Sequence, residues 1–420
     1  MNDEIKIKNI HAREILDSRG NPTIECEIAL ENGIKETSSV PSGASTGIYE
    51  AYELRDGDLN RYFGKGVLKA VNNINTIINE TLKGRNVFNQ DELDSLLIHL
   101  DGTENKSNLG ANALLATSLA LCKAGAKASN LEVFEYLNKE NTNYQIPRPM
   151  MNIINGGQHA LNNIDIQEFM IVPFSYSSFK EGLRKCVEVY HSLKKVLLER
   201  KISSLGVGDE GGFAPNLKKD EEALKIIIKA IEKANYVPGV DFKISLDVAS
   251  SSWYDPNSEK YVLTKSKKVY SRTQLIAYYK RLIKKYPIYS IEDGMDENDI
   301  EGWKLLTKRL GKKVLLVGDD LFTTNEKRLK MGVENHLANS ILIKPNQIGT
   351  ISEVLKTIKT AKDNNYQIII SHRSGETNSS FISDLSVSVN APLIKSGAPC
   401  RMERVIKYNR LLQIEEQIEK

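Results

Sequence analysis

The sequence predicts an α/β protein with two parts, an N-terminal α+β domain and a C-terminal β/α barrel. The first third of the chain has strand-like patterns followed by helix-like patterns. The remainder alternates short apolar segments with helix-favouring stretches. A chain of 420 residues is too long for one ordinary domain, but it can hold a large barrel and a smaller domain.

The N-terminal third has its strands before its helices, the order expected of an α+β domain. Apolar and polar residues alternate over 24–30, the period of a half-buried strand. Asn32-Gly33 follows, and this dipeptide between apolar runs is a strong hairpin signal. Apolar residues recur every three or four positions over 67–82, and Ala111–Ala128 is rich in alanine, so both stretches are predicted helices.

The polar segment 138–143, followed by Pro147-Arg148-Pro149, marks the predicted domain boundary. We therefore predict an N-terminal domain over 1–140 and a barrel over 141–420. After Glu292 each strand and its helix together occupy roughly 25–30 residues, about the size of one strand–helix repeat. Six such units favour a β/α barrel, with an open doubly wound sheet as the alternative. The strands are expected at 242–246, 288–291, 314–317, 340–343, 367–370 and 392–394.

A charged residue follows each of these six strands. In a β/α barrel the C-terminal ends of the strands share one face, where the active site lies. One such residue alone is most simply a solvated loop charge, but six in succession favour a shared site. The residues are Asp247, Glu292, Asp319, Lys344, the segment His372-Arg373-Ser374, and Lys395.

The three carboxylates in this set indicate a metal ion. Left unpaired, they would repel and raise one another's pKa values. Their oxygens favour a hard divalent cation, Mg²⁺ or Mn²⁺, over zinc. Asp247, Glu292 and Asp319 would leave open positions for water and a substrate oxygen. Such a cation suits a substrate carboxylate that gains negative charge in the transition state.

The two lysines provide a candidate base. Burial and nearby positive charge lower the pKa of a lysine and make it a usable base at neutral pH. Lys344 or Lys395 could then remove a weakly acidic proton next to a carboxylate; alternatively, both are only ion-pair partners of the acids. Arg373 and Ser374, with the amides of their loop, form a candidate phosphate clamp, although Arg-Ser-Gly is common in turns.

Two glycine-rich segments need separate interpretation. Gly206, Gly208 and Gly211 have the spacing of a dinucleotide-binding fingerprint. The preceding segment has helical spacing, however, and Asp209-Glu210 would repel a pyrophosphate, so we predict a loop that presents an acid. The other segment, Ser42-Gly-Ala-Ser-Thr-Gly47, lacks the Lys-Ser/Thr pair of a P-loop. It is either a plain mobile turn or a lid over a phosphorylated substrate.

The composition argues against several functions. The 57 basic and 54 acidic residues give a net charge of +3 and are interspersed, which gives no case for nucleic-acid or membrane binding. The four cysteines lie far apart without a Cys-x-x-Cys pair, so neither a zinc site nor a disulfide framework is expected. The charged start of the chain and the lack of a bilayer-length apolar stretch predict a cytoplasmic protein.

An ordered set of motifs, running from about Ala12 to Leu412, resembles the enolase family. Each motif alone is moderately specific, whereas the ordered set is very specific. The motifs include Val40-Pro-Ser-Gly-Ala-Ser-Thr-Gly47, Asn155-Gly-Gly-Gln-His-Ala160, Asp165-Ile-Gln-Glu-Phe-Met170, Gly208-Asp-Glu-Gly-Gly-Phe-Ala-Pro-Asn216, Ser290-Ile-Glu-Asp-Gly294, Gly318-Asp-Asp-Leu-Phe322, Lys344-Pro-Asn-Gln-Ile-Gly-Thr350 and Ser371-His-Arg-Ser-Gly-Glu-Thr377.

The resemblance implies a fold, a reaction and an assembly. Enolases have an N-terminal α+β domain and a C-terminal TIM-barrel variant whose first units depart from simple alternation. They are lyases that interconvert 2-phosphoglycerate and phosphoenolpyruvate plus water in glycolysis and gluconeogenesis. Two Mg²⁺ ions per active site are expected, in keeping with the superfamily's use of a Lys or His base with Mg²⁺. A homo-oligomer, either a dimer or a ring of dimers, is also implied.

The resemblance also assigns roles to single residues. Lys344 would remove the C2 proton, while Glu210, supported by Glu168, would help the C3 hydroxide leave. His99 and His191 lie in helical stretches and are expected to be structural. The first magnesium would be bound by Asp247, Glu292 and Asp319, and the second by Ser42 on the lid. Lys395 would stabilise the enolate. Substrate contact or positioning is implied for His159, Gln167, His372, Arg373 and Ser374.

The chain departs from the family pattern at few positions, and none of them carries a role given above. Leu161 replaces a usual acid, and Asn378-Ser379-Ser380 replaces residues that are often acidic. A sibling acid-sugar dehydratase is one alternative function, and it would not need the phosphate clamp or the lid. A non-catalytic binding role, as a surface receptor or an RNA-processing subunit, is another; a terminal Lys420 is its only and weak signal.

Overall fold

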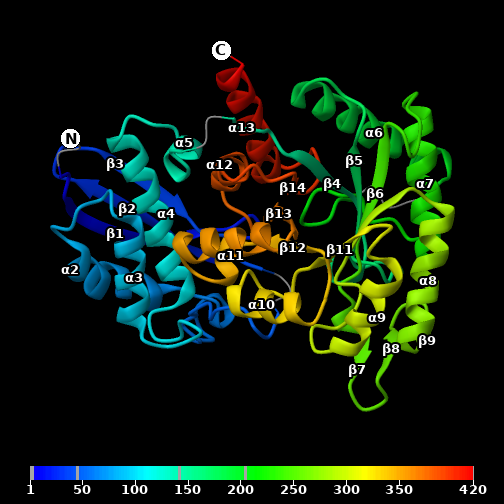
Figure 1. The fold of residues 1–420 in the computed structure, drawn as a ribbon, viewed down its shortest axis with the longest axis horizontal. Coiled ribbons are helices and arrows are strands. Elements are labelled where there is room, and N and C mark those ends of the chain that lie inside the picture. The colour runs from blue at the N-terminus through cyan, green and yellow to red at the C-terminus, as the bar shows by residue number, and fades with distance from the viewer. Residues whose placement is uncertain (1–3, 44–46, 141–142, 203–205, 420) are drawn as a thin grey trace.

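The computed structural model describes residues 4–419 except 44–46, 141–142 and 203–205. In Figure 1 the N-terminal domain (blue to cyan) lies on one side of a barrel (green to red). No helix in the described ranges is long and apolar enough to cross a membrane.

The N-terminal domain is built on a three-stranded antiparallel sheet in the order β1-β2-β3. Its strands are β1 (Ile7–Leu16), β2 (Pro22–Leu30) and β3 (Lys35–Ser39). The predicted Asn32-Gly33 turn joins β2 to β3, and Gly33 has a φ of 89°, which a side chain would disfavour. Ile24, Cys26 and Ile28 of β2 are fully buried, because α4 (Ala111–Ala128) packs against β2 and β3.

The predicted helix over 67–82 is present, with a change of pitch in its middle. It comprises α1 (Leu68–Asn73), a π-helical turn η2 (Ile74–Ile78) and α2 (Asn79–Leu82). Asn75 exchanges hydrogen bonds of 2.7 and 3.0 Å with the backbone of Ala12 on the edge strand β1, which satisfies backbone groups that the sheet leaves open. The other helices of this domain are η1 (Tyr62–Gly64), α3 (Gln90–Asp101) and α5 (Val133–Leu137).

The second part is a closed barrel of eight strands in the order β10-β11-β12-β13-β14-β4-β5-β6. The closed barrel shows that the alternative of an open doubly wound sheet is wrong. The strand β5 runs antiparallel to both neighbours, and the other ladders are parallel. The strands are β4 (Arg148–Asn155), β5 (Glu168–Pro173), β6 (Phe242–Asp247), β10 (Ile288–Glu292), β11 (Leu315–Gly318), β12 (Ser340–Ile343), β13 (Gln367–Ser371) and β14 (Leu393–Lys395).

Helices cover the outside of the barrel, short 3₁₀ turns (η3, η4 and η5) follow some of its strands at the mouth, and a small sheet extends from it. The helices are η3 (Gly157–His159), α6 (Phe179–Glu199), α7 (Asp220–Lys233), η4 (Ser250–Trp253), α8 (Arg272–Lys285), α9 (Ile300–Leu310), α10 (Glu326–Glu334), η5 (Pro345–Gln347), α11 (Ile351–Asp363), α12 (Phe381–Ser388) and α13 (Met402–Ile418). The sheet contains β7 (Tyr254–Asp255), β8 (Lys260–Leu263) and β9 (Lys268–Tyr270).

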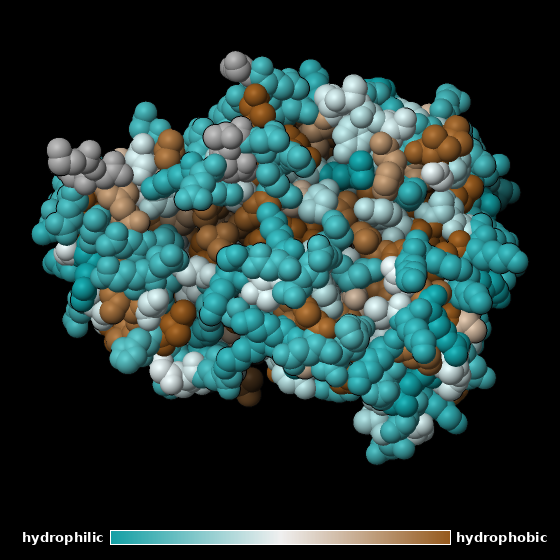
Figure 2. All heavy atoms as spheres, in the orientation of Figure 1, coloured by the Kyte–Doolittle hydropathy of each residue, from teal (hydrophilic) through white to brown (hydrophobic). Residues whose placement is uncertain are grey.

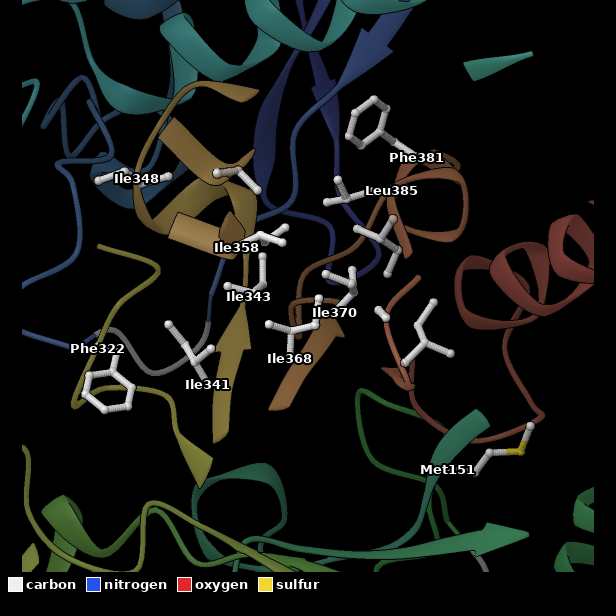
Figure 3. Close-up of a cluster of buried hydrophobic side chains, with 14 of the residues drawn as sticks. Met151, Phe322, Ile341, Ile343, Ile348, Ile358, Ile368, Ile370, Phe381 and Leu385 are labelled. Carbon is white, nitrogen blue, oxygen red and sulfur yellow. The ribbon is translucent and has the colours of Figure 1, made fainter. Parts of the chain in front are cut away.

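Alternation along the strands separates two cores. Leu342 and Ile369 belong to a cluster that fills the barrel interior. Their neighbours Ile341, Ile343 and Ile368 face the surrounding helices and join the larger core, part of which Figure 3 shows. On the face shown in Figure 2 hydrophilic side chains predominate, and apolar residues are scattered among them. The barrel is therefore a packed scaffold, and its strands carry their charged groups mainly at their C-terminal ends.

Helix α13 supplies a buried ion pair on which stability is expected to depend. Lys407 and Glu376 are 1% and 3% exposed, and their Nζ and Oε2 atoms are 2.7 Å apart. Burial lowers the pKa of Lys407. Burial raises the pKa of Glu376, but the positive charges of Lys407 and Arg404 outweigh this effect, so the net shift of the Glu376 pKa is downward.

We expect Lys407→Met to destabilise the protein by about 3–5 kcal/mol, because it leaves a buried charge without its partner. Urea unfolding measures this loss, and adding Glu376→Gln to Lys407→Met should recover part of it. Because the folded-state pKa of Glu376 is lowered, the stability from its ionisation is present at neutral pH and is lost as the pH falls through that value. Equal denaturation midpoints for Lys407→Met and the wild type would contradict the prediction.

Candidate active site at the barrel mouth

The structure brings the six charged strand ends together at one mouth of the barrel. Asp247, Glu292 and Lys395 are the last residues of β6, β10 and β14. Asp319, Lys344 and His372 directly follow β11, β12 and β13. Asp247 and Glu292 are cross-strand neighbours in the β6–β10 ladder, so the closed sheet itself sets their proximity.

A small polar cavity lies at this mouth. It contains almost every site residue that the sequence predicted, with Glu292 and Ser42 as the exceptions. Glu292 is still joined to the cavity, because Lys395 contacts it. The lining residues are His159, Gln167, Glu168, Glu210, Asp247, Asp319, Lys344, Ser371, His372, Arg373, Ser374 and Lys395.

Ser42 lies at the edge of the site and has partners of its own. Its hydroxyl donates to Glu53 at 3.1 Å and accepts from Arg55 at 3.1 Å. Its backbone pairs with Gly375, which places the start of the predicted lid beside the loop that follows β13. Residues 44–46 of the predicted lid lie outside the described residues, so lid closure stays a prediction.

Lys395 holds three carboxylates at the centre of the site. Its buried Nζ lies 2.8 Å from Glu292, 3.0 Å from Glu168 and 3.1 Å from Asp247. Burial lowers the pKa of Lys395, but these carboxylates outweigh it and raise the pKa well above its ordinary value. In this arrangement the three carboxylates hold Lys395 in its charged form. Gln167 donates to Asp247 at 3.4 Å and helps to position that carboxylate.

Lys344 forms an ion pair with Asp319, and Gln347 donates to the same carboxylate at 2.8 Å. The expectation that surrounding groups lower the pKa of Lys344 is wrong for this arrangement. Burial and the cation Arg373 do lower the pKa, but Asp319 raises it further, and the net shift is upward. Lys344 can thus act as a base only when Asp319 is engaged by another positive charge.

The carboxylates around Asp319 fit a hard cation. Asp293, Asp319 and Asp320 can each place an oxygen within 4.8 Å of the others. Burial and neighbouring carboxylates raise the pKa values of Glu292, Asp293 and Asp320 well above their ordinary range, the mark of excess negative charge. A second hollow shares these groups and is lined by Gln158, Gln167, Asp247, Ala249, Ser251, Ser252, Asp293, Glu297, Asp319 and Asp320. The predominance of oxygen donors matches Mg²⁺ better than zinc.

On the other side of the cavity two carboxylates face two histidines. His159 Nδ1 lies 3.3 Å from Glu168 and 3.8 Å from Glu210, and His372 Nε2 lies 3.5 Å from Glu210. Burial and Glu210 raise the pKa of Glu168, whereas for Glu210 the histidines outweigh burial and lower the pKa. A proton shared by this pair therefore resides on Glu168. Glu210 stands on a loop after helix α6, which confirms the prediction of an acid-presenting loop in place of a dinucleotide site.

Arg373, the predicted phosphate ligand, is paired with an acid that the sequence analysis did not identify. Its guanidinium binds Glu50 through two contacts, at 2.9 and 3.1 Å, and Asn346 at 3.0 Å. Arg373 is buried, and only 8% of the Glu50 side chain is exposed. Glu50 lies just after the predicted lid and occupies the donors that an anion would use.

Sequence reasoning missed several residues of the site. Asp293 and Asp320 directly follow predicted ligands, so adjacency to Glu292 and Asp319 was an available signal. Glu50, Asn152 and Arg404 carry no local signal, because only the folded chain brings them to the site. Asn152, for example, donates to Glu210 at 2.9 Å from inside β4.

The remaining predicted positions lie away from the chemistry. His99 and His191 are exposed on α3 and α6 and do not line the cavity, in keeping with a structural role. Leu161 is fully exposed. Asn378 is exposed as well, so neither departure from the family pattern removes a group from the cavity.

An eight-stranded barrel with carboxylates and lysines gathered at its mouth defines a β/α-barrel enzyme. The model of the enolase N-terminal domain matches residues 7–137, and that of the enolase C-terminal TIM barrel domain matches residues 143–420. The chain therefore belongs to the enolase family, a group of hydratases and lyases whose members typically use Mg²⁺. These matches agree with the α+β domain and the variant barrel described above.

Proposed function

We propose that this protein interconverts 2-phosphoglycerate and phosphoenolpyruvate plus water, the reaction of glycolysis and gluconeogenesis. The observation that carries the proposal is the buried guanidinium of Arg373 in the same cavity as Lys344 and the carboxylates. A planar cation with several donors suits a phosphate group. A sibling that acts on acid sugars has no use for such a buried anion site.

The residues of the cavity divide the reaction between its two sides. Bound by Asp247, Glu292 and Asp319, Mg²⁺ would supply positive charge that stabilises negative charge developing on the substrate carboxylate. Lys344 would remove the C2 proton, and its pKa would fall once Asp319 no longer serves as its anionic partner. On the other side, Glu168 holds a proton beside ionised Glu210 and would donate it to the departing C3 hydroxide, which leaves as water. Lys395 remains charged and stabilises the same negative charge as the metal.

A spectrophotometric assay tests the proposal directly. Phosphoenolpyruvate formation from 2-phosphoglycerate is followed in the ultraviolet, with Mg²⁺ and with a chelator added. Turnover that requires Mg²⁺ is the expected result. Turnover of acid sugars without phosphate, or no turnover by folded protein in Mg²⁺, would overturn the proposal. The terminal Lys420 of the alternative binding function lies outside the described residues.

Glu50 is expected to compete with the phosphate group of the substrate for Arg373. We predict that Glu50→Gln tightens the binding of inorganic phosphate by about tenfold, because an anion no longer has to displace a carboxylate held by charged hydrogen bonds. Competitive inhibition by phosphate measures the change. Glu53→Gln is the matched control, since Glu53 pairs with Arg55, and it should leave phosphate inhibition unchanged. Weaker inhibition in Glu50→Gln would contradict the competition.

The proposal extends to the assembly and the location of the protein. A homo-oligomer, a dimer or a ring of dimers, in the cytoplasm is expected, and no nucleic acid or membrane partner is proposed. Leu59 and Phe63 on the N-terminal domain are 78% and 90% exposed. Such exposed apolar residues support a surface for contact between protomers. Sedimentation of the purified protein distinguishes a monomer from the expected oligomers.

A further inference from the structure

Arg404 is a fully buried cation beside the loop that carries Glu210, and the reaction described above gives it no role. It lies in the first turn of α13, and its relative exposure is 0%. Its nearest carboxylate is that of Glu403, at 3.6 Å. Its guanidinium instead donates to neutral acceptors, namely Nδ1 of His372 at 2.6 Å, the carbonyls of Arg373 and Ser374, and the carbonyl of Asp209 at 3.1 Å.

These contacts join two loops of the active site. One loop follows β13 and carries His372, Arg373 and Ser374, and the other carries Glu210 next to Asp209. A buried guanidinium with several donors in a fixed plane can hold both loops at once. A role as a structural anchor would need nothing more than these carbonyl contacts.

The contact with His372 has a chemical consequence of its own. A guanidinium has only donors and does not lose its proton in proteins, so Nδ1 of His372 must be the acceptor. Neutral His372 therefore carries its hydrogen on Nε2, the atom that lies 3.5 Å from Oε2 of Glu210. Burial, with a smaller contribution from Arg404, lowers the pKa of His372 to about 4 against the opposing effects of Glu210 and Glu376.

We propose that Arg404 is a positioning residue that fixes the tautomer of His372, so that its Nε2–H is directed at the carboxylate of Glu210. The Glu210 carboxylate then accepts a hydrogen bond from Asn152, at 2.9 Å, and faces the Nε2–H of His372 at 3.5 Å, too far for a formed hydrogen bond. The hydrogen bond and the nearby N–H dipole both favour the ionised carboxylate. This leaves Glu168 as the protonated member of the pair. The inference rests on the proposed function only where it concerns turnover.

Nitrogen NMR of the full chain labelled with ¹⁵N-histidine tests the tautomer. The chain has six histidines, and comparison with His372→Asn assigns the signal of His372. The wild type should show a protonated Nε2 and an unprotonated Nδ1. Arg404→Lys keeps a donor-only group and should keep this tautomer. Arg404→Gln introduces an amide that can also accept, and it should give a mixture of the two tautomers.

Turnover measurements on the same variants link the tautomer to the reaction. Arg404→Gln should lower kcat by about 10–100-fold with little change in KM, and Arg404→Lys should recover most of the loss. Lys407→Met is the matched control, because it removes another buried cation from the same helix and should leave the tautomer of His372 unchanged.

Three results would overturn the inference: a wild-type His372 protonated on Nδ1, an unchanged tautomer in folded Arg404→Gln, or a changed tautomer with unchanged kcat. If Arg404→Gln does not fold, the spectra of the wild type and Arg404→Lys still decide the assignment. Failure of the proposed function is distinguishable, because the wild type would then show no turnover while its His372 tautomer remains measurable.

Discussion

Lys344→Ala is expected to lower kcat for phosphoenolpyruvate formation by about 10⁴-fold, the upper end of what a positioned general base contributes. Lys344 lines the cavity, and its Nζ is held by Asp319, a proposed metal ligand. Its loss removes the proton acceptor but leaves the anion clamp and Lys395 in place. KM for 2-phosphoglycerate should therefore change little, and the loss should appear in kcat and kcat/KM alike.

The control for this prediction is another buried lysine. Lys106 is 3% exposed, pairs with Glu353 at 2.7 Å and does not line the cavity, so Lys106→Ala tests the effect of losing another buried ammonium group. Exchange of the C2 hydrogen with solvent deuterium separates the base from the acid. Lys344→Ala should abolish this exchange. Glu210→Gln should slow product formation but still exchange the C2 hydrogen. A Lys344→Ala enzyme that still exchanges the C2 hydrogen would show that another group is the base.

Glu292→Gln and Asp247→Asn are expected to weaken Mg²⁺ binding by at least about 100-fold, because each removes a charged ligand from a site built on three carboxylates. Both residues are buried and contact Lys395, so the neutral amide fits the same space. Isothermal titration of purified protein with Mg²⁺ measures the change, and the Mg²⁺ dependence of turnover should shift in parallel.

The variant Asp320→Asn distinguishes two possible sets of Mg²⁺ ligands. Asp319 belongs to the triad predicted from the sequence, but the structure also places it within reach of Asp293 and Asp320. Asp320 is only partly buried, so Asp320→Asn is a mild change and should leave the first Mg²⁺ affinity almost unaltered. If Asp320→Asn weakens binding as strongly as Glu292→Gln does, the cation is held by the second set and the predicted triad is incorrect.

Much of the fold could be predicted from the sequence, because its strands and helices have strong local patterns. The helix Ala111–Ala128, the turn at Asn32-Gly33 and all six predicted barrel strands are present, the strands with ends within a residue or two. The strands β4 and β5 were missed. β5 is buried throughout and β4 at every residue after Arg148, so they lack the alternation that marks a half-buried strand. In addition, β4 begins inside the Pro-Arg-Pro segment that indicated a boundary.

The candidate site was predictable wherever its residues directly follow a strand. In a β/α barrel the C-terminal end of every strand lies on the functional face. Local sequence was therefore enough to name Asp247, Glu292, Asp319, Lys344 and Lys395. Glu50 could not, because it reaches Arg373 from the other domain, 323 residues away in the chain. Arg404 likewise could not be named, because it reaches His372 from a helix that follows the last barrel strand.

The sequence by itself therefore determined the fold class and the chemical types gathered at the barrel mouth, because these depend on periodicity and on strand ends, and its ordered motifs indicated the family. The tertiary structure alone decided which groups are in contact and hence where the protons lie. The pKa of Lys344 is the clearest case, since burial and Arg373 lower it but contact with Asp319 raises it. The charge of Asp319, a few ångströms from Lys344, decides the direction of this pKa shift, and only the closed barrel sets that distance.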